Sequence, residues 1–191
     1  MLQQLIISRV RVKILTLFFS HPEVMYHVRE IVRQTTEEIN AVRRELKHLE
    51  KAGLLAKEPR ANRLYYRLRT DYPLYFELLG LIAKTTHLGG DILKNKGKLG
   101  KLKFVMMSGQ FARGVPRVEG RVDLLVVGTV VIPELSVLIR TEEERRGCEI
   151  NYTVMTEDEF RFRKSRKDPF IIEVLRGSRV LIVGDEEELV K

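Results

Sequence analysis

A chain of 191 residues, 44% hydrophobic and 31% charged, has the composition of a soluble globular protein with one sizeable domain or two small ones. No stretch approaches the roughly 18 uninterrupted apolar residues of a membrane-spanning helix, so we expect no membrane partner. The net charge of +8 is uneven, with 14 Lys and Arg against 8 Asp and Glu in residues 1–71, 9 against 3 in 72–121, and 11 against 15 in 122–191. The basic first two thirds indicate either a polyanionic partner or a solvated lysine-rich surface.

The N-terminal sequence and the cysteine content favour a cytoplasmic protein. Arginines and a lysine interrupt the apolar residues of MLQQLIISRVRVKILTLFFSHP, and no small-residue cleavage site follows them, unlike in a secretory signal. Cys148 is the single cysteine, so it has no internal disulfide partner, which fits a reducing compartment.

Two helices are predicted before residue 35. The first covers residues 3–19 and ends at His21-Pro22. Its apolar residues at helical spacing are Leu5, Ile6, Val10, Ile14, Leu15, Phe18 and Phe19. The second covers 26–34, where Val28, Ile31 and Val32 form an apolar stripe.

A third helix follows a short turn, and its apolar residues at helical spacing, opposite a polar face, are Ile39, Val42, Leu46 and Leu49. Thr35 or Thr36 is the expected N-cap, and Glu38 stands three residues after Thr35 as in a capping box. Gly53 ends the helix in the usual C-terminal position. Residues 54–68 then predict a β-hairpin with a Pro-Arg-Ala-Asn-Arg tip.

The predicted elements follow in the order helix, helix, turn, helix and hairpin, and the segment TTEEINAVRRELKHLEKAGLL is followed by a basic hairpin. This arrangement resembles the winged helix-turn-helix family over roughly residues 8–70. This resemblance implies double-stranded DNA as a partner, with the third helix in the major groove. That helix offers Thr35, Thr36, Asn40, Arg43, Arg44 and Lys47, and the hairpin offers Lys57, Arg60, Asn62 and Arg63. Asn and Arg are the residue types that contact adenine and guanine edges in pairs of hydrogen bonds. The hairpin tip is either a solvated charged turn or a DNA-contacting wing, and the helix before it favours the wing.

A helix over residues 72–86 is expected to break at Gly89-Gly90 and to lead through a lysine-rich segment into a second domain. Leu74, Leu78, Leu79 and Ile82 lie on one side of this helix, so it is a candidate for dimerisation of a homodimer, although packing within one chain explains the stripe equally well. From residue 104 onwards, strands alternate with helices, which predicts a small α/β sheet packed by helices. The predicted organisation is α+β with two domains: 1–71, a helical connector at 72–100, and 101–191.

The second domain resembles the minimal nucleotidyltransferases of the polymerase-beta-like superfamily over about residues 100–184. Gly109 to Gly114, GQFARG, matches the GSFARG turn of that family, and GRVDLLVVG matches its Asp-x-Asp strand. Gln110 replaces the serine, Arg121 stands at the first aspartate and Asp123 at the second, and we expect Arg121 to pair with Asp123. The resemblance extends to RRGCEINYTVM, where Glu149 is the candidate for a third acidic position, and the turn also carries Arg113.

Such enzymes use two carboxylates to hold Mg²⁺ ions that bridge nucleotide phosphates. With an arginine in the place of one carboxylate, we expect no catalytic and no metal-binding residues, and a nucleotide or Mg²⁺ only if the residual site functions. The first hypothesis is therefore a sequence-specific DNA-binding transcriptional regulator whose inactive second domain serves nucleotide sensing, oligomerisation or binding of a protein partner. The alternatives are an active Mg²⁺-dependent nucleotidyltransferase with autoregulation, or a component of a toxin–antitoxin pair.

Overall fold

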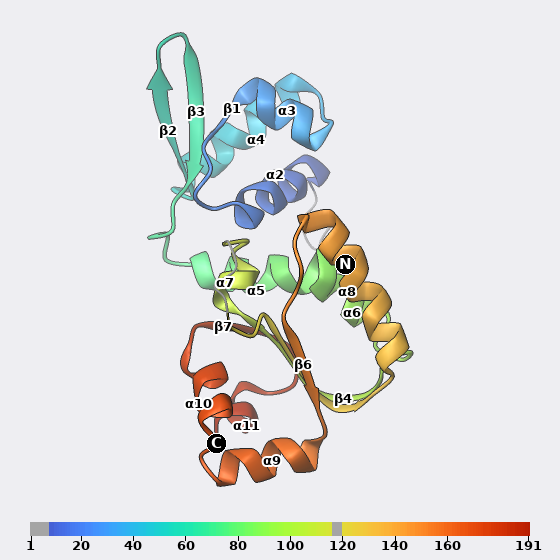
Figure 1. Ribbon diagram of the computed structural model, residues 1–191. Helices are drawn as coiled ribbons and strands as arrows, with labels where there is room; N and C mark the ends of the chain where they lie inside the picture. Colours follow the sequence, from blue (N-terminus) through green and yellow to red (C-terminus); the bar gives the residue numbers. More distant parts are fainter. Residues whose placement is uncertain (1–7, 116–119) are drawn as a thin grey trace. The chain divides into compact units, whose positions relative to one another are not determined.

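The computed structural model describes residues 8–115 and 120–191 as an α+β protein (Figure 1). The chain divides into two compact units, the first ending at Ile82 and the second covering Ala83–Lys191, so the predicted connector at 72–100 contributes to both. Leu5 and Ile6 of the predicted first helix, and residues 116–119 between the GQFARG turn and the GRVDLLVVG segment, lie outside the described residues. Within the described ranges, every helix is too short or too polar to span a membrane.

The first unit combines helices with a small antiparallel sheet. Its elements are α2 (Arg9–Ser20), β1 (Tyr26–His27), α3 (Val28–Thr35), α4 (Ile39–Lys51), β2 (Leu55–Arg60) and β3 (Arg63–Leu68), and α5 (Tyr75–Thr85) follows. The strand order is β1-β3-β2. The two residues of β1 pair with Tyr65 and Tyr66, whereas the sequence placed them in the second helix.

The core of the first unit forms where the apolar stripes of three helices meet. Ile14 and Phe18 of α2, Ile31 of α3 and Leu46 of α4 are fully buried. Burying these stripes together removes apolar surface from water, the main stabilising contribution to such a small unit. The predicted first three helices therefore exist, with shifted boundaries.

The start of α4 differs from the prediction. Thr35 is the last residue of α3, and Thr36 follows in the left-handed conformation, with φ of 53°. The N-cap of α4 is Glu38, whose carboxylate accepts hydrogen bonds from the backbone N–H groups of Asn40 and Ala41. The predicted capping box between Thr35 and Glu38 is therefore wrong, because the glutamate caps the helix itself.

The end of α4 and the hairpin agree with the sequence. Gly53 has φ of +80°, a conformation that favours glycine, and the N–H of Leu54 reaches back to the Leu49 carbonyl oxygen. The hairpin closes through two residues, since Arg60 pairs with Arg63 across the tip.

The predicted break at Gly89-Gly90 is wrong. Both glycines lie buried inside α6 (His87–Lys94), and the interruption between α5 and α6 falls at Thr86, the N-cap of α6, instead. A Cβ atom on Gly89 would lie 2.0 Å from the Ala83 carbonyl oxygen. These glycines therefore permit close packing of the chain rather than a turn.

The second unit contains a four-stranded mixed sheet. Its remaining elements are β4 (Gly100–Ser108), α7 (Gly109–Ala112), β5 (Leu124–Val130), α8 (Ile132–Arg146), β6 (Tyr152–Met155), α9 (Glu157–Ser165), α10 (Pro169–Arg176), β7 (Arg179–Val183) and α11 (Glu186–Val190). The strand order is β6-β5-β4-β7, in which β5 and β6 are parallel and joined through α8, and the other pairs are antiparallel.

One face of this sheet is covered by the three helices α9, α10 and α11. Each contributes one buried apolar residue, namely Phe160, Ile171 and Leu189, to a core shared with the sheet. The strand residues of that core are Phe104, Met106, Leu125, Val127 and Met155. Alternate residues of β4 and β5 are equally buried and point to the opposite face, so the sheet is covered on both sides.

Candidate functional site

The exposed face of α4 carries the predicted DNA-contacting side chains. Asn40, Arg43, Arg44 and Lys47 are all exposed, and Thr36 is exposed just before the helix. The opposite face of the helix is buried through Val42, Leu46 and Leu49. The segregation that the periodicity predicted is therefore present in the structure.

The acidic residues near these cations are engaged elsewhere. Glu45 of α4 accepts hydrogen bonds from Ser8 at 2.6 Å and from Arg11 at 2.7 Å. Glu37 is paired with Arg9 at 2.9 Å and with Lys13 at 2.6 Å, and these two hydrogen-bonded partners hold the pKa of Glu37 below its ordinary value.

Glu50, on the last turn of α4, pairs with Lys57 of β2 at 2.6 Å. Within residues 8–115 and 120–191, Arg43, Arg44 and Lys47 form no salt bridge, although the charges of Arg43 and Arg44 act on the Glu38 carboxylate from a longer distance. Three cations on one helix face are therefore available to an external anion.

Thr35 does not belong to this face. Its side chain is buried, with 5% of the residue exposed, and its hydroxyl donates to the Ile31 carbonyl oxygen at 2.7 Å. Its own carbonyl oxygen accepts from Lys13 Nζ at 2.7 Å. Thr35 closes α3 and is not available to contact DNA.

The N-terminus of α4 already carries an anion of the protein. Two backbone hydrogen bonds hold the pKa of the Glu38 carboxyl below its ordinary value, so the group is ionised at neutral pH. This carboxylate occupies the amide groups that would otherwise attract a phosphate. Contacts to an external polyanion therefore depend on the side chains further along the helix.

The four predicted hairpin residues fall into two groups. Lys57 is engaged with Glu50, which raises the pKa of its ammonium group, and Arg60 is paired with Glu58 at 2.7 Å while its guanidinium carbon lies 5.8 Å from the centre of the Tyr65 ring. Asn62 and Arg63 are exposed at the tip. Among the described contacts, neither tip side chain has a hydrogen bond or an ion pair. The tip thus offers one unpaired cation and one amide.

Sequence reasoning missed two arginines on α3. Arg29 and Arg33 are exposed one helical turn apart, and within the described part of the chain neither has an ion pair. The sequence did carry a signal for them: residues four apart share a helix face, and Arg29 and Arg33 lie on the face opposite the buried Ile31.

The turn after β4 is a second candidate site. Ser108 caps α7 by accepting a hydrogen bond from the Phe111 N–H at 3.2 Å. The N–H of Gly109 donates to the Ser178 carbonyl oxygen at 2.6 Å, and a Cβ atom on Gly109 would lie 2.1 Å from Ser178 Oγ. Arg113 also reaches the Ser178 hydroxyl, at 3.5 Å, whereas Gln110 is half-buried. Gly109 is required here for close approach of two segments.

The expected ion pair between Arg121 and Asp123 is wrong. Arg121 is exposed and precedes β5, which begins at Leu124, so the alternation of a strand does not place the two side chains on one face. Asp123 is buried, and its carboxylate accepts a hydrogen bond from the Asn151 backbone N–H at 2.9 Å. Among the described residues these two form no ion pair, and Asp123 instead joins the start of β5 to the segment before β6.

Glu149, the candidate for a third acidic position, is exposed. In residues 8–115 and 120–191, no group of three or more His, Cys, Asp and Glu side chains is arranged to hold a metal ion. Among these described residues, Asp123 therefore belongs to no group of carboxylates of the kind that a magnesium site uses.

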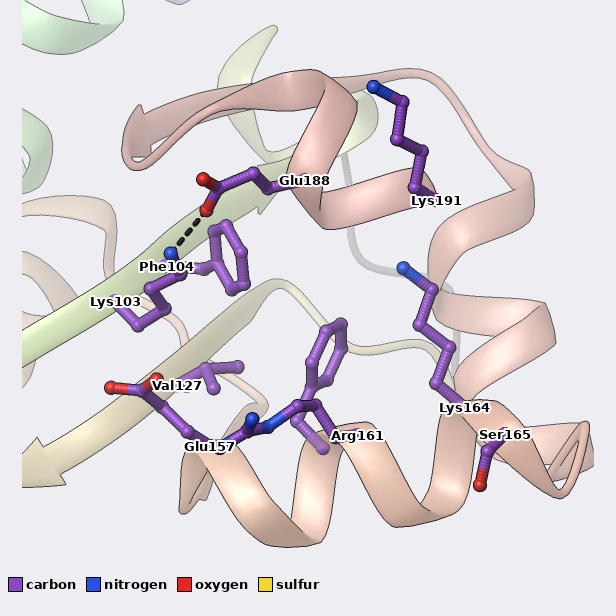
Figure 2. A pocket seen from close by; sticks show the side chains of 10 residues that line it. Lys103, Phe104, Val127, Glu157, Arg161, Lys164, Ser165, Glu188 and Lys191 are labelled. Atoms are coloured by element: carbon purple, nitrogen blue, oxygen red, sulfur yellow. Dashed lines mark hydrogen bonds and ion pairs between the residues drawn. The ribbon is translucent and has the colours of Figure 1, made fainter.

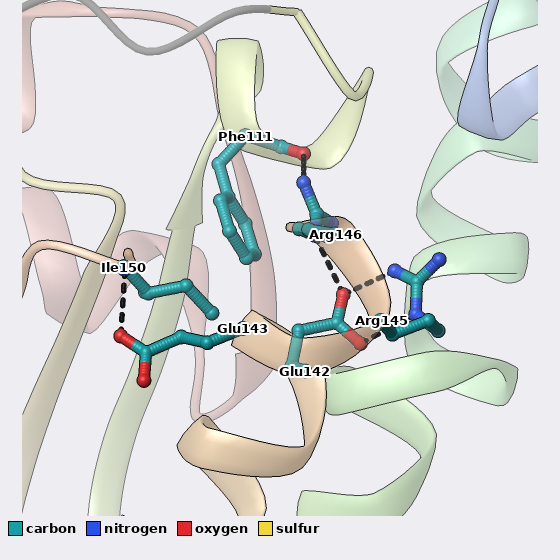
Figure 3. Close-up of polar contacts among 6 residues, drawn as sticks. All are labelled: Phe111, Glu142, Glu143, Arg145, Arg146 and Ile150. Atoms are coloured by element: carbon teal, nitrogen blue, oxygen red, sulfur yellow. Dashed lines mark hydrogen bonds and ion pairs between the residues drawn. The ribbon is translucent and has the colours of Figure 1, made fainter. Parts of the chain in front are cut away.

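A buried ionic cluster supports the α7 turn from α8, and it was not predicted (Figure 3). Glu142 is 3% exposed and pairs with Arg146 at 2.7 Å and with Arg145. The Arg146 guanidinium carbon lies 3.7 Å from the centre of the Phe111 ring, and its Nη1 donates to the Phe111 carbonyl oxygen at 3.1 Å. Burial opposes ionisation of Glu142, but the two arginines outweigh this effect and hold its pKa below the ordinary value.

Comparison of the chain with protein-family models, with curated proteins and with solved structures gave no match.

Proposed function

We propose that this protein is a sequence-specific double-stranded DNA-binding transcriptional regulator whose first unit acts as a winged helix-turn-helix domain. The observation that carries the proposal is the exposed face of α4, where Arg43, Arg44 and Lys47 form no salt bridge within the described residues and Asn40 lies beside them. Phosphate neutralisation by such cations supplies affinity, and asparagine and arginine supply contacts to base edges.

The hairpin extends this surface. Asn62 and Arg63 at its tip would contact the backbone or enter the adjacent minor groove, where arginine gains from the concentrated negative potential. Lys57 and Arg60 hold acidic side chains of the unit itself and would contribute to affinity only when those ion pairs open. We therefore assign the wing contacts chiefly to the tip.

For the second unit we propose a nucleotidyltransferase-like fold without catalysis, used for nucleotide sensing or oligomerisation. Two features support this assignment: the glycine turn after β4, and the single carboxylate at the start of β5, which is hydrogen-bonded to the Asn151 N–H. Incubation with labelled nucleoside triphosphates and Mg²⁺ should give no covalent transfer, and labelling that is abolished by Asp123→Ala would contradict the assignment.

We also propose a homodimer, because two copies would read a palindromic site. Leu79 and Ile82 of α5 are buried, whereas Leu74, just before the helix, is 53% exposed and Phe76 in its first turn is 64% exposed. Leu74 is therefore the part of the predicted stripe that remains open to a second copy, and Phe76, which the stripe did not include, adds exposed apolar surface next to it.

The test begins with selection of bound fragments from a random DNA pool, followed by affinity measurements on the selected duplex and on a scrambled one. Arg43→Ala and Arg44→Ala should each weaken binding to the selected duplex by roughly 10-fold or more, and by less on the scrambled duplex. Arg140→Ala, which removes an exposed arginine of α8, is the matched control and should change neither affinity. Equal affinity of the unaltered protein for both duplexes would exclude sequence-specific binding.

A further inference from the structure

The second unit contains a cavity of about 490 Å³ that neither candidate site uses (Figure 2). It lies on the sheet face covered by α9 and α11, beside Lys103 and Phe104 of β4. Ser108, where the α7 turn begins, stands at the other end of the same strand. The volume is within the range of pockets that bind small molecules, about 300–1,000 Å³.

The base of the cavity is apolar. Phe104, Val127 and Phe160 line it from β4, β5 and α9, and all three belong to the core of the unit. The pairing of β4 with β5 shifts register between Leu102 and Phe104. Such a bulge redirects side chains, and here it allows the consecutive residues Lys103 and Phe104 both to line the same cavity.

The rim carries four cations, Lys103, Arg161, Lys164 and Lys191, and two carboxylates, Glu157 and Glu188. Lys103 and Lys164 place their ammonium groups 5.3 Å and 5.5 Å from the ring centres of Phe104 and Phe160. Their methylene stems extend the apolar wall, while their charged ends stay at its edge. Figure 2 shows Lys164 and Lys191 on one side of the cavity, and Lys103 with Glu188 on the other.

Most of these charges are neutralised by the protein. Lys103 pairs with Glu188, Arg161 with Asp158 at 2.8 Å, and Lys191 with Glu187 at 2.8 Å.

Lys164 is the exception. Within the described residues it has no carboxylate partner, and its Nζ donates instead to the Leu189 carbonyl oxygen at 2.6 Å. An ammonium group has three donors, so two remain for a ligand. Burial also lowers the pKa of Lys164, which an anionic ligand would reverse.

We propose that this cavity binds a small organic carboxylate with an aromatic body, with the carboxylate at Lys164 Nζ and the ring against the methylene stems of Lys103 and Lys164 and the accessible edges of Phe104 and Phe160. A charge-assisted hydrogen bond at Lys164 fixes the acid end, and the apolar base recognises the remainder. A small inorganic anion leaves the base uncovered, and a neutral analogue leaves Lys164 without a counter-charge. The proposal concerns a ligand site and does not depend on DNA binding.

The test uses the full chain and follows backbone amide signals by NMR during titration with phenylacetate and 1-naphthaleneacetate. Saturable shifts should concentrate at residues 103–104, 160–165 and 188–191. Phenylacetamide and acetate, which lack the charge and the aromatic body respectively, should bind at least 10-fold more weakly than phenylacetate. Equal affinity of the amide and the acid, or the absence of shifts around the cavity at millimolar phenylacetate, would overturn the proposal.

Three variants test whether Lys164 binds the carboxylate of the ligand. Lys164→Met should weaken phenylacetate binding by about 10-fold or more, since it removes the charge and keeps an apolar stem. Lys164→Arg keeps the positive charge and should retain most of the affinity. This result would show that Lys164→Met weakens binding through loss of the charge and not through loss of the hydrogen bond to the Leu189 carbonyl oxygen. Lys101→Met removes an exposed lysine of the same strand as Lys103 and should leave the affinity unchanged. An equal loss in Lys101→Met and Lys164→Met would reduce the effect to net charge and refute the site.

Discussion

Arg146 lies flat against Phe111, with its guanidinium carbon 3.7 Å from the ring centre and one nitrogen donating to the carbonyl oxygen of the same residue. One side chain of α8 thereby fixes both the ring and the backbone of the α7 turn. Because Arg146 also pairs with the buried Glu142, the turn is tied to the interior of the unit.

We expect Arg146→Ala to destabilise the second unit by about 2 kcal/mol, since it removes a cation–π contact and a hydrogen bond and leaves Glu142 with one arginine. The urea midpoint of the unit, followed through NMR signals of β4 and β5, measures this change. Arg140→Ala, on the exposed side of the same helix, should have the same urea midpoint as the unaltered protein. A loss of less than about 0.5 kcal/mol in Arg146→Ala would show that the turn holds without this contact.

His87 should make the second unit sensitive to mild acid. Burial lowers the pKa of its imidazole below the ordinary 6.5, and the positive charge of Arg145 lowers it further, against the opposing influence of Glu142. Arg146 adds to the lowering and Asp91 opposes it. A group whose pKa is depressed by folding stabilises the folded state above its unfolded pKa, so stability should fall as the pH drops below about 6.5.

The measurement for His87 is the urea midpoint of the second unit between pH 7.5 and pH 5. His87→Asn removes the titration and suits this position, because His87 has φ of 49° and asparagine tolerates that conformation. The variant should lose less stability than the unaltered protein over this range. Parallel pH profiles of the two proteins would assign the acid sensitivity to other groups.

Gly109→Ala should destabilise the α7 turn. The added Cβ would lie 2.1 Å from Ser178 Oγ and 2.8 Å from the Ser178 carbonyl oxygen, and the second contact involves backbone that cannot rotate away. Overpacking of this kind costs about 1–3 kcal/mol. Gly177→Ala is the matched control, since a Cβ there meets nothing within 4 Å, and it should leave thermal unfolding unchanged. Equal melting temperatures for both variants would show that the segments separate easily.

The tip of the hairpin should control the salt dependence of DNA binding. If Arg63 neutralises one phosphate, Arg63→Ala should reduce the slope of log affinity against log salt concentration by about 1. Arg60→Ala should change the slope less, because Arg60 is already paired with Glu58. Affinities at several salt concentrations on one duplex provide the comparison, and unchanged slopes in both variants would place the hairpin away from the DNA.

The sequence predicted the helices that show hydrophobic periodicity, but it did not predict the parts of the structure that depend on tertiary contacts. The stripe of Val42, Leu46 and Leu49 correctly located α4, because a 3.6-residue period follows directly from burial of one helix face. The two residues of β1 have no such signal, since they are a strand only through their pairing with β3.

The misread glycines and charges have the same cause. A Gly-Gly pair in a sequence is typical of a break in a helix, but here the space left by the missing side chains is filled by the backbone at Ala83 and Thr85. Arg121 and Asp123 are two residues apart, yet the strand that would align them starts only at Leu124. Glu142 and Phe111 lie 31 positions apart, and their link through Arg146 follows from the packing of α8 and not from any local pattern.

Lys13 of α2 pairs with Glu37 and also donates to the carbonyl oxygen of Thr35. The geometry between α3 and α4 is therefore not encoded by those two helices alone, since the cation that joins the end of one to the loop before the other comes from a third. A peptide of residues 26–53 would retain both helical sequences but lose the cation that contacts both the end of α3 and the loop before α4. The smallest autonomous folding unit with this turn must include α2.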